Sequence, residues 1–531
     1  MSATPASAST AVSATATAEP GRQGSPSPAT TGQPSPGAGK KRLRKSPKPV
    51  DPIDAARKAR RRNNIPAEPN TAEPLPKRIL RTPLVWLSVA MLLAYAVCLV
   101  LLYRQVVPDR QVPGGLIPGL GTEAIPIAAR YAAITAIPLS LLFLWADRFR
   151  PQRFWVWLMT FGWGGCVATL VSAQVNTWAA SHLSIVGDGD PATGARAAIY
   201  VAPFVEEAAK GTVLFWLVIL MRYQWVSRVS GIVLAGLSGA AFAFVENILY
   251  YGRAYRYAAR TFGEVAPLDA IQDLFMLRGV MTFFAHPLFT AMTGIGLAVA
   301  VRSKSKVVRV VAPLAGFVAA AFLHMCFNAS ASLLQGRQLL LIYLLVAIPL
   351  VLGMVIFLIR QILREGLLIR TRLAEYARLG WLPETDPMVL ARLRTRGRAL
   401  WQSIFLGWNV FVATVRMQRS ATELAYLRDS MVRGIIDSAG ADREKVLLHR
   451  MYALQGLAVV EPAARAAYPS LRRRRSVPAT LAYAPAEFPG PAGLGGNYPA
   501  PPPQSHPVAG LPGQAAIHYS EVDPTWKPPG Q

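Results

Sequence analysis

Long apolar runs are the feature that most constrains how this chain can fold. Runs of 16 to 28 residues recur between residues 83 and 359, and about 20 apolar residues are enough to cross a bilayer as a helix. The chain is 52% hydrophobic with positive mean hydropathy, which is more apolar than soluble domains usually are. We therefore predict an all-α, polytopic transmembrane bundle of about eight spans. The runs are approximately 83–103, 131–146, 154–174, 198–221, 229–251, 275–301, 307–334 and 339–359.

The formal net charge of +27 is distributed in a way that predicts topology. In a soluble protein such a charge would suggest nucleic-acid binding, but here the basic residues lie in the tails and in short loops beside apolar runs. The loops 146–153, 222–228 and 302–309 are basic, whereas 104–122 and 175–197 are poor in Lys and Arg, and 252–274 is mixed. Since basic loops stay in the cytoplasm, we predict that both termini are cytoplasmic.

The chain outside the apolar runs divides into three further segments. Residues 1–82 are rich in Ala, Ser, Thr and Pro and contain two basic clusters, so we predict a disordered cytoplasmic tail without a cleavable signal peptide. Residues 83–360 form the membrane domain, 361–469 a cytoplasmic helical segment, and 470–531 a Pro-rich disordered tail. We expect the basic tails to contact anionic lipid rather than nucleic acid. Because Cys98, Cys166 and Cys326 all lie inside apolar runs and no CxxC occurs, neither disulfides nor a thiolate metal site is predicted.

Four consecutive spans carry polar groups in their interiors, where an ionisable side chain is costly and usually functional. In the run 307–334, Gly316, Ala320, His324 and Asn328 recur every four residues along one helical face, and similar lines of small residues occur in the two preceding runs. Small residues at this spacing mark close helix contacts, so the polar groups should point into the bundle. Loop charge places them all in the outer half of the membrane. The interior polar residues are Glu206, Glu207, Lys210, Glu246, Asn247, His286, His324 and Asn328.

This set of residue types is suited to activating water. A buried glutamate can accept a proton from water, and a histidine or an amide can stabilise the resulting oxyanion. Alternatively His286, His324 and either Glu207 or Glu246 could hold zinc as a His₂Glu site. The residues do not decide between the metal and the glutamate mechanism. The absence of HExxH and GxSxG patterns argues against the proteases that those motifs define.

Two other functions would use the same features differently. A transporter could use the carboxylates as a proton or cation relay, but it would be expected to show internal repeats and matching broken helices, and neither is evident. An inactive scaffold would bind membrane partners through the long tails and would tolerate substitution of the glutamates. The remaining histidines lie in loops or tails and are assigned no role; they are His182, His449, His506 and His518.

The motifs together resemble those of the PrsW family of intramembrane proteases. The resemblance covers about residues 83–360 and rests on EEAAK at 206–210, FAFVEN at 242–247, the span of His286, and the HxxxN of His324 and Asn328. The related CAAX prenyl proteases and Abi proteins carry FxxxH where this chain has FxxxE, ending at Glu246, so the PrsW side is favoured.

The resemblance implies an intramembrane endopeptidase of the bacterial plasma membrane. Its substrates would be single-span membrane proteins such as anti-sigma regulators. Glu206 or Glu207 would be the general base and Glu246 a second carboxylate, while His286, His324 and Asn328 would complete the catalytic set. Lys210 and Asn247 would support the site, with zinc as the cofactor in the metal alternative.

Overall fold

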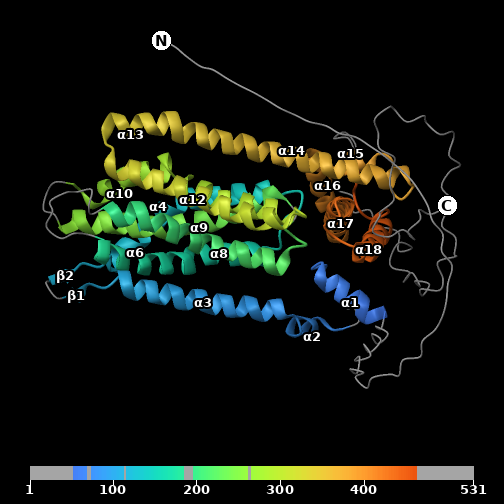
Figure 1. Cartoon of the computed structure of the whole chain (residues 1–531), viewed down its shortest axis with the longest axis horizontal. Helices are drawn as coiled ribbons and strands as arrows, with labels where there is room; N and C mark the ends of the chain where they lie inside the picture. Colours follow the sequence, from blue (N-terminus) through green and yellow to red (C-terminus); the bar gives the residue numbers. More distant parts are fainter. Residues whose placement is uncertain are drawn as a thin grey trace, which may run out of the picture. The chain divides into compact units, whose positions relative to one another are not determined.

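The computed structural model describes residues 52–67, 73–112, 115–183, 195–225, 227–260 and 265–462. Our predictions for residues 1–51 and 463–531, which make up most of the two predicted disordered tails, lie outside these described residues. Figure 1 shows long helices running side by side, with shorter helices following the last span. The prediction of an all-α fold is confirmed; in the described chain the exception is a small hairpin of β1 (Arg110–Val112) and β2 (Gly115–Ile117).

Seven of the predicted spans are helices long and apolar enough to cross a membrane. Some consist of several segments because π-helical turns interrupt them. They are α3 (Pro83–Val106); α4 (Gly121–Ala146); α5 (Phe154–Gly162), η1 (Trp163–Ala168) and α6 (Thr169–Leu183); α9 (Arg228–Arg260); α10 (Pro267–Phe275), η3 (Met276–Met281) and α11 (Ala285–Val301); α12 (Lys306–Leu333); and α13 (Gly336–Ile342), η4 (Tyr343–Ala347) and α14 (Ile348–Arg378).

The eighth predicted span is formed by η2 (Ala197–Val201) and α8 (Ala202–Met221). Three ionisable residues make it less apolar than the other seven: Glu206, Glu207 and Lys210. It contacts α6, α9, α11 and α12, and the three ionisable residues are buried on the side that faces these helices, where they are shielded from lipid. Each predicted span therefore coincides with a helix, and seven of these helices are candidate membrane spans in the described residues. The helix α4 begins ten residues earlier than expected, and α14 continues well beyond residue 359.

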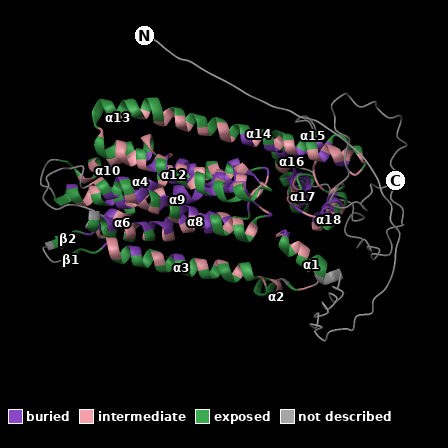
Figure 2. Ribbon diagram, viewed as in Figure 1, coloured by how far each residue is buried: buried purple, intermediate pink, exposed green. Residues whose placement is uncertain are grey.

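Burial distinguishes the core of the bundle from its lipid-facing helices. In Figure 2, α9 is largely buried, whereas α3 and α13 are largely exposed. The exposed side chains of α3 are large and apolar, and they include Trp86, Leu93 and Val97. An exposed surface of this composition is expected where the solvent is hydrocarbon rather than water.

The spans around α9 are in close contact through glycines, as the spacing of small residues predicted. A Cβ at Gly231 would lie 2.4 Å from the carbonyl oxygen of Gly294, and one at Gly239 would lie 2.8 Å from the backbone of His286. A Cβ at Gly164 would lie 2.1 Å from the carbonyl oxygen of Ser238. No side chain fits at these distances, so the glycines allow α5–η1 and α11 to pack directly on α9.

The segment after the spans forms a second helical cluster. The end of α14 packs with α15 (Asp386–Leu390), α16 (Leu393–Leu406), α17 (Trp408–Val432) and α18 (Ala439–Leu454) around a core that includes Leu373, Leu424 and Leu447. The described part of residues 361–469 is thus largely helical, and its cytoplasmic location stays a prediction.

Part of the N-terminal tail differs from its prediction. Residues within 1–82 form α1 (Pro52–Arg62) and α2 (Leu75–Leu80), and α1 contacts α18. Asn63 donates a 2.5 Å hydrogen bond to Asp437, and Ile65 is buried in the C-terminal core. Because one apolar side chain and one amide find partners in a distant segment, residues 52–65 are ordered where composition alone predicted disorder.

Candidate active site in the membrane bundle

The predicted polar residues of α8, α9, α11 and α12 do come together. Glu207 and Lys210 have no exposed surface, and Glu206, His286 and His324 are all buried. The two glutamates and the lysine share a face of α8 because they are three and four residues apart. His286 lies at the beginning of α11, just after a break at residues 282–284 that separates this helix from η3. Four helices thus converge on one buried polar cluster.

Lys210 lies between the acidic and the imidazole groups. Its Nζ is 2.7 Å from Oε1 of Glu207, 3.5 Å from Oε2 of Glu206 and 3.0 Å from Nδ1 of His286. It also lies 4.1 Å from the ring centroid of Phe242, close enough for a cation–π interaction. Such contacts compensate for the cost of removing an ammonium group from water.

The two adjacent glutamates are held very differently. Glu207 accepts hydrogen bonds from Lys210, from Oγ1 of Thr290 at 2.8 Å and from Nδ1 of His324 at 3.1 Å. Glu206 accepts a 3.1 Å hydrogen bond from Nδ2 of Asn176, and its Oε2 lies 3.5 Å from Lys210 and 3.8 Å from Nε2 of His324. The carboxylate of Glu207 is therefore fixed on all sides, whereas that of Glu206 has one loosely held oxygen facing the histidines.

The third carboxylate, Glu246, is fixed by an arginine that we did not predict. Arg278 of η3 lies 2.5 Å from Oε2 of Glu246 and donates a 2.9 Å hydrogen bond to Oδ1 of Asn247. Its guanidinium also lies 3.9 Å from the ring centroid of Tyr250. Asn247, for which we predicted a supporting role, thus has Arg278 as its partner. An arginine inside the run 275–301 was the sequence signal for this contact. Nothing in the sequence singled out Asn176, whereas Thr290 belongs to the line of residues, four apart, that passes through His286.

The hydrogen bonds also determine which ring nitrogens of the histidines carry protons. Nε2 of His286 lies 2.9 Å from Glu246 and donates to it, so its Nδ1 accepts from Lys210. Nδ1 of His324 donates to Glu207, which leaves the lone pair of Nε2 directed toward Glu206. The two rings meet edge to face with centroids 5.1 Å apart. Each histidine therefore has a carboxylate at one ring nitrogen and directs the other ring nitrogen toward the common centre.

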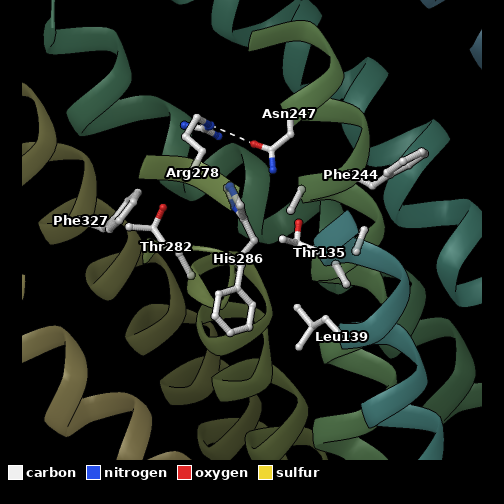
Figure 3. A pocket seen from close by; sticks show the side chains of 13 residues that line it. Thr135, Leu139, Phe244, Asn247, Arg278, Thr282, His286 and Phe327 are labelled. Carbon is white, nitrogen blue, oxygen red and sulfur yellow. Dashed lines mark hydrogen bonds between the residues drawn. The ribbon is translucent and has the colours of Figure 1, made fainter. Parts of the chain in front are cut away.

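A cleft reaches this cluster from the side of α4. It is small, with a cavity volume of about 20 Å³, and lies between α4, α9 and the η3–α11 segment. Figure 3 shows His286 between Asn247 and Arg278 on one side and Leu139 below, with Thr135 facing the same space. The cleft has a polar end at His286 and an apolar end at α4.

Asn328 is placed differently from the other predicted residues. Its Nδ2 donates a 2.8 Å hydrogen bond to the carbonyl oxygen of Ala198 in η2. This contact ties α12 to the segment that precedes α8. One amide hydrogen of Asn328 is thus used in positioning backbone, and the amide has a second one.

The cluster fits a divalent metal ion in the type and number of its ligands. Glu206, His286 and His324 each offer a ligand atom, and these atoms lie within 4.8 Å of one another. The carboxylate in this group is Glu206, whereas our sequence prediction named Glu207 or Glu246. Those two glutamates instead accept hydrogen bonds from the histidines, which is how ligating histidines are usually oriented. A metal ion would share the space with the ammonium group of Lys210.

Comparison with known proteins supports the resemblance seen in the motifs. The family model described as PrsW family intramembrane metalloprotease matches residues 152–354. This segment of the chain is thus similar to the PrsW family. The matched segment is narrower than the resemblance that we drew from motifs, and it extends from α5 into α14. No curated protein and no solved structure gives a significant match.

The match to the PrsW family over these residues, together with the apolar helices, supports a membrane-embedded protease, which is a hydrolase of peptide bonds. The family description also names a metal, and the buried Glu–His–His group is where the described chain offers ligands for one. Substrates of an intramembrane protease are membrane proteins.

Proposed function

We propose that the PrsW-like domain is an endopeptidase in which Glu206 is the carboxylate at the reacting centre. The observation that carries this proposal is the difference between the two adjacent glutamates. Glu207 is bound by three partners at 2.7–3.1 Å, whereas Glu206 has an oxygen whose contacts to Lys210 and His324 are 3.5 and 3.8 Å long. A carboxylate that must accept a proton needs an uncommitted lone pair, and Glu206 has one.

The remaining residues orient and stabilise this centre. Glu207 fixes the ring of His324, and Glu246, itself held by Arg278, fixes the ring of His286. Glu206 would accept the proton of the attacking water and return a proton to the leaving amide nitrogen. The ammonium group of Lys210 would stabilise the negative charge that develops on the scissile carbonyl oxygen. Asn328 stays a proposed second donor, through the amide hydrogen that Ala198 does not take.

Where a divalent metal ion such as zinc is bound, Glu206, Nδ1 of His286 and Nε2 of His324 would hold it. The metal would lower the pKa of its bound water and polarise the scissile carbonyl. In either case the two orienting carboxylates keep their roles, because they contact the nitrogens that do not face the centre.

Single-span membrane proteins, including anti-sigma-type regulators, are the proposed substrates. Charge-derived topology puts the cluster in the outer half of the plasma membrane with both termini cytoplasmic. A helical substrate must unwind before its peptide carbonyl can react, so sites with Gly, Pro or β-branched residues near the outer end of the span should be cut preferentially. We propose that an unwound segment enters beside the small cleft between α4 and α11, which His286 lines.

Comparison of protein termini in membrane fractions tests this proposal. Cells would carry the wild-type protein, Glu206→Gln, or the matched control Glu123→Gln, which alters an exposed glutamate in the first turn of α4. We expect new termini in single-span proteins with the wild type and the control, and their loss with Glu206→Gln. The same termini in all three strains would refute the proposal, and Glu206-dependent termini at cytoplasmic ends would refute the depth assignment.

The role of a metal has a separate test. Metal content of the purified protein would be measured for the wild type, His324→Ala and the Glu123→Gln control. One zinc per chain, lost with His324→Ala and removed together with activity by a chelator, would assign the metal mechanism. Full activity of metal-free protein would assign the glutamate mechanism.

A further inference from the structure

The turn between α16 and α17 exposes an unusual group of apolar side chains. Trp401, Ile404, Phe405 and Leu406 end α16, and Trp408 begins α17. Between 45% and 74% of the surface of each residue is exposed. We call these five residues the aromatic tip. Soluble protein surfaces rarely gather so many large apolar residues without a partner.

The helices α16 and α17 form a helical hairpin, and its packing explains why the aromatic tip faces outward. Arg396, Ala399 and Ser403 form the inner face of α16 and are buried, and Arg396 donates hydrogen bonds to the carbonyl of Gln418 and the hydroxyl of Thr422 in α17. The opposite face of α16, which carries Trp401 and Phe405, is therefore exposed. Gly407, with φ of +114°, then allows the sharp turn into α17. The tip points outward because the inner side of α16 is already packed against α17.

Both arms of the hairpin are attached to the point where two spans end. Arg396 donates a 3.2 Å hydrogen bond to the carbonyl of Phe149, and Arg419 of α17 donates one of 3.1 Å to the carbonyl of Pro151. Phe149 and Pro151 belong to the short segment that joins α4 to α5, and Phe154 at the start of α5 is itself exposed. Phe405 lies nine residues beyond Arg396, so the tip is roughly 14 Å from this attachment. That distance keeps the tip within reach of the membrane surface.

The chemistry of α16 matches a lipid surface. Along its outer face, Arg394 and Arg398 precede Trp401 and Phe405 at helical spacing, and α16 contains no acidic residue. Tryptophan and phenylalanine beside arginine are typical of helices that lie in the interfacial region, with basic groups at lipid phosphates. The rings of Trp401 and Phe405 already pack edge to face with centroids 5.2 Å apart.

We propose that the aromatic tip is an interfacial membrane anchor. Its indole and phenyl rings enter the headgroup region of the leaflet next to the α4–α5 connection, and Arg394 and Arg398 contact anionic lipid headgroups. The anchor holds the C-terminal helical cluster against the membrane independently of the bundle. This inference does not rest on the proposed proteolytic mechanism.

Depth-dependent fluorescence quenching tests the anchor in the full-length protein. The chain would be reconstituted as single copies in nanodiscs that contain anionic lipid and nitroxide-labelled lipid, with Cys98, Cys166 and Cys326 replaced by alanine. An environment-sensitive fluorophore would be attached at Asn409→Cys beside the tip, or at Glu384→Cys, an exposed control position in the same cluster. We expect strong quenching and a blue-shifted emission at 409, and neither at 384.

A second pair of variants shows which side chains cause the quenching. Phe405→Glu with Trp408→Glu should abolish the quenching at 409, whereas Glu384→Gln should leave it unchanged. Since the tip is exposed, the thermal stability of the double variant should match that of its parent. Equal, weak quenching at positions 409 and 384 in single-copy nanodiscs would overturn the proposal. Association between copies that is lost with the double variant would likewise overturn it, because a second chain would then cover the tip. If quenching at 409 is lost in nanodiscs made of neutral lipid but present in those with anionic lipid, the role of the two arginines is supported.

Discussion

Replacing Lys210 with methionine should destabilise the protein strongly, and the structure indicates by how much. The side chain has no exposed surface, and its ammonium group is 2.7 Å from Glu207 and 3.0 Å from His286. Methionine has a similar length and keeps the apolar contacts of the stem, including those near Phe242. The variant therefore removes the charge with little change in volume.

The expected loss of unfolding free energy follows from the buried carboxylates that remain without a cation. Removing one partner of a buried ion pair usually costs about 3–5 kcal/mol, because the other charge is left buried and uncompensated. Here two carboxylates, Glu206 and Glu207, lose the same cation. We expect a loss at the upper end of that range. In the double variant Lys210→Met with Glu207→Gln, most of the loss should disappear, since a neutral amide no longer needs the cation.

The assay is a double-mutant cycle on the purified protein in one detergent. Denaturation midpoints and free energies of unfolding would be measured for the wild type, both single variants and the double variant. We expect a coupling energy of about 3 kcal/mol or more between the two sites. Additive effects, or a Lys210→Met variant within about 1 kcal/mol of wild type, would show that the buried ion pair assigned here does not exist.

Three further predictions concern other parts of the chain. Gly231→Ala places a Cβ 2.4 Å from the carbonyl oxygen of Gly294 and should cost about 1–3 kcal/mol of stability, whereas the control Gly353→Ala, with no atom within 4 Å, should have little effect in the same denaturation assay. Arg278→Gln should lower the proteolytic rate but not metal content, because it releases an orienting carboxylate and no ligand; an unchanged rate would contradict its role. Burial raises the pKa of Asp147, at the end of α4, to about 8, so the folded protein retains a proton that the unfolded chain releases near pH 4, and stability should fall as pH rises toward 8. Asp147→Asn should flatten that part of a thermal-stability profile between pH 5 and 9, and a profile identical to wild type would exclude this explanation.

The spans and the polar cluster were predictable because their signals are local. Runs of about 20 apolar residues identify the helices, and the spacing of Glu206, Glu207 and Lys210 puts them on one face whatever the helix packs against. The glycine lines likewise predicted close packing, which Gly231 and Gly294 show.

The contacts that were missed depend on where distant segments meet. Arg278 of η3 contacts Glu246 just before the break at residues 282–284, and no periodicity in the sequence predicts that break. Asn176 and Thr290 are ordinary polar residues of long spans until they reach Glu206 and Glu207. Glu206, rather than its neighbour Glu207, groups with the two histidines. This choice depends on small differences in distance that the local sequence does not reveal.

Ordering of residues 52–65 was missed for a similar reason. A basic, alanine-rich segment has too little apolar surface to fold alone. Ile65 and Asn63 are stabilised only because α18 and Asp437 are present to receive them.

The central claim is that Glu206, and not Glu207, lies at the reacting centre. The most direct test is the single-turnover cleavage rate of a single-span substrate by reconstituted protein, measured for the wild type, Glu206→Gln and Glu207→Gln at equal folded fractions. We predict that Glu206→Gln folds normally and loses on the order of 10²–10⁴ in rate, the contribution of a positioned acid–base group, while Glu207→Gln loses stability and less rate per folded molecule. A Glu206→Gln protein that cleaves at the wild-type rate would contradict the account.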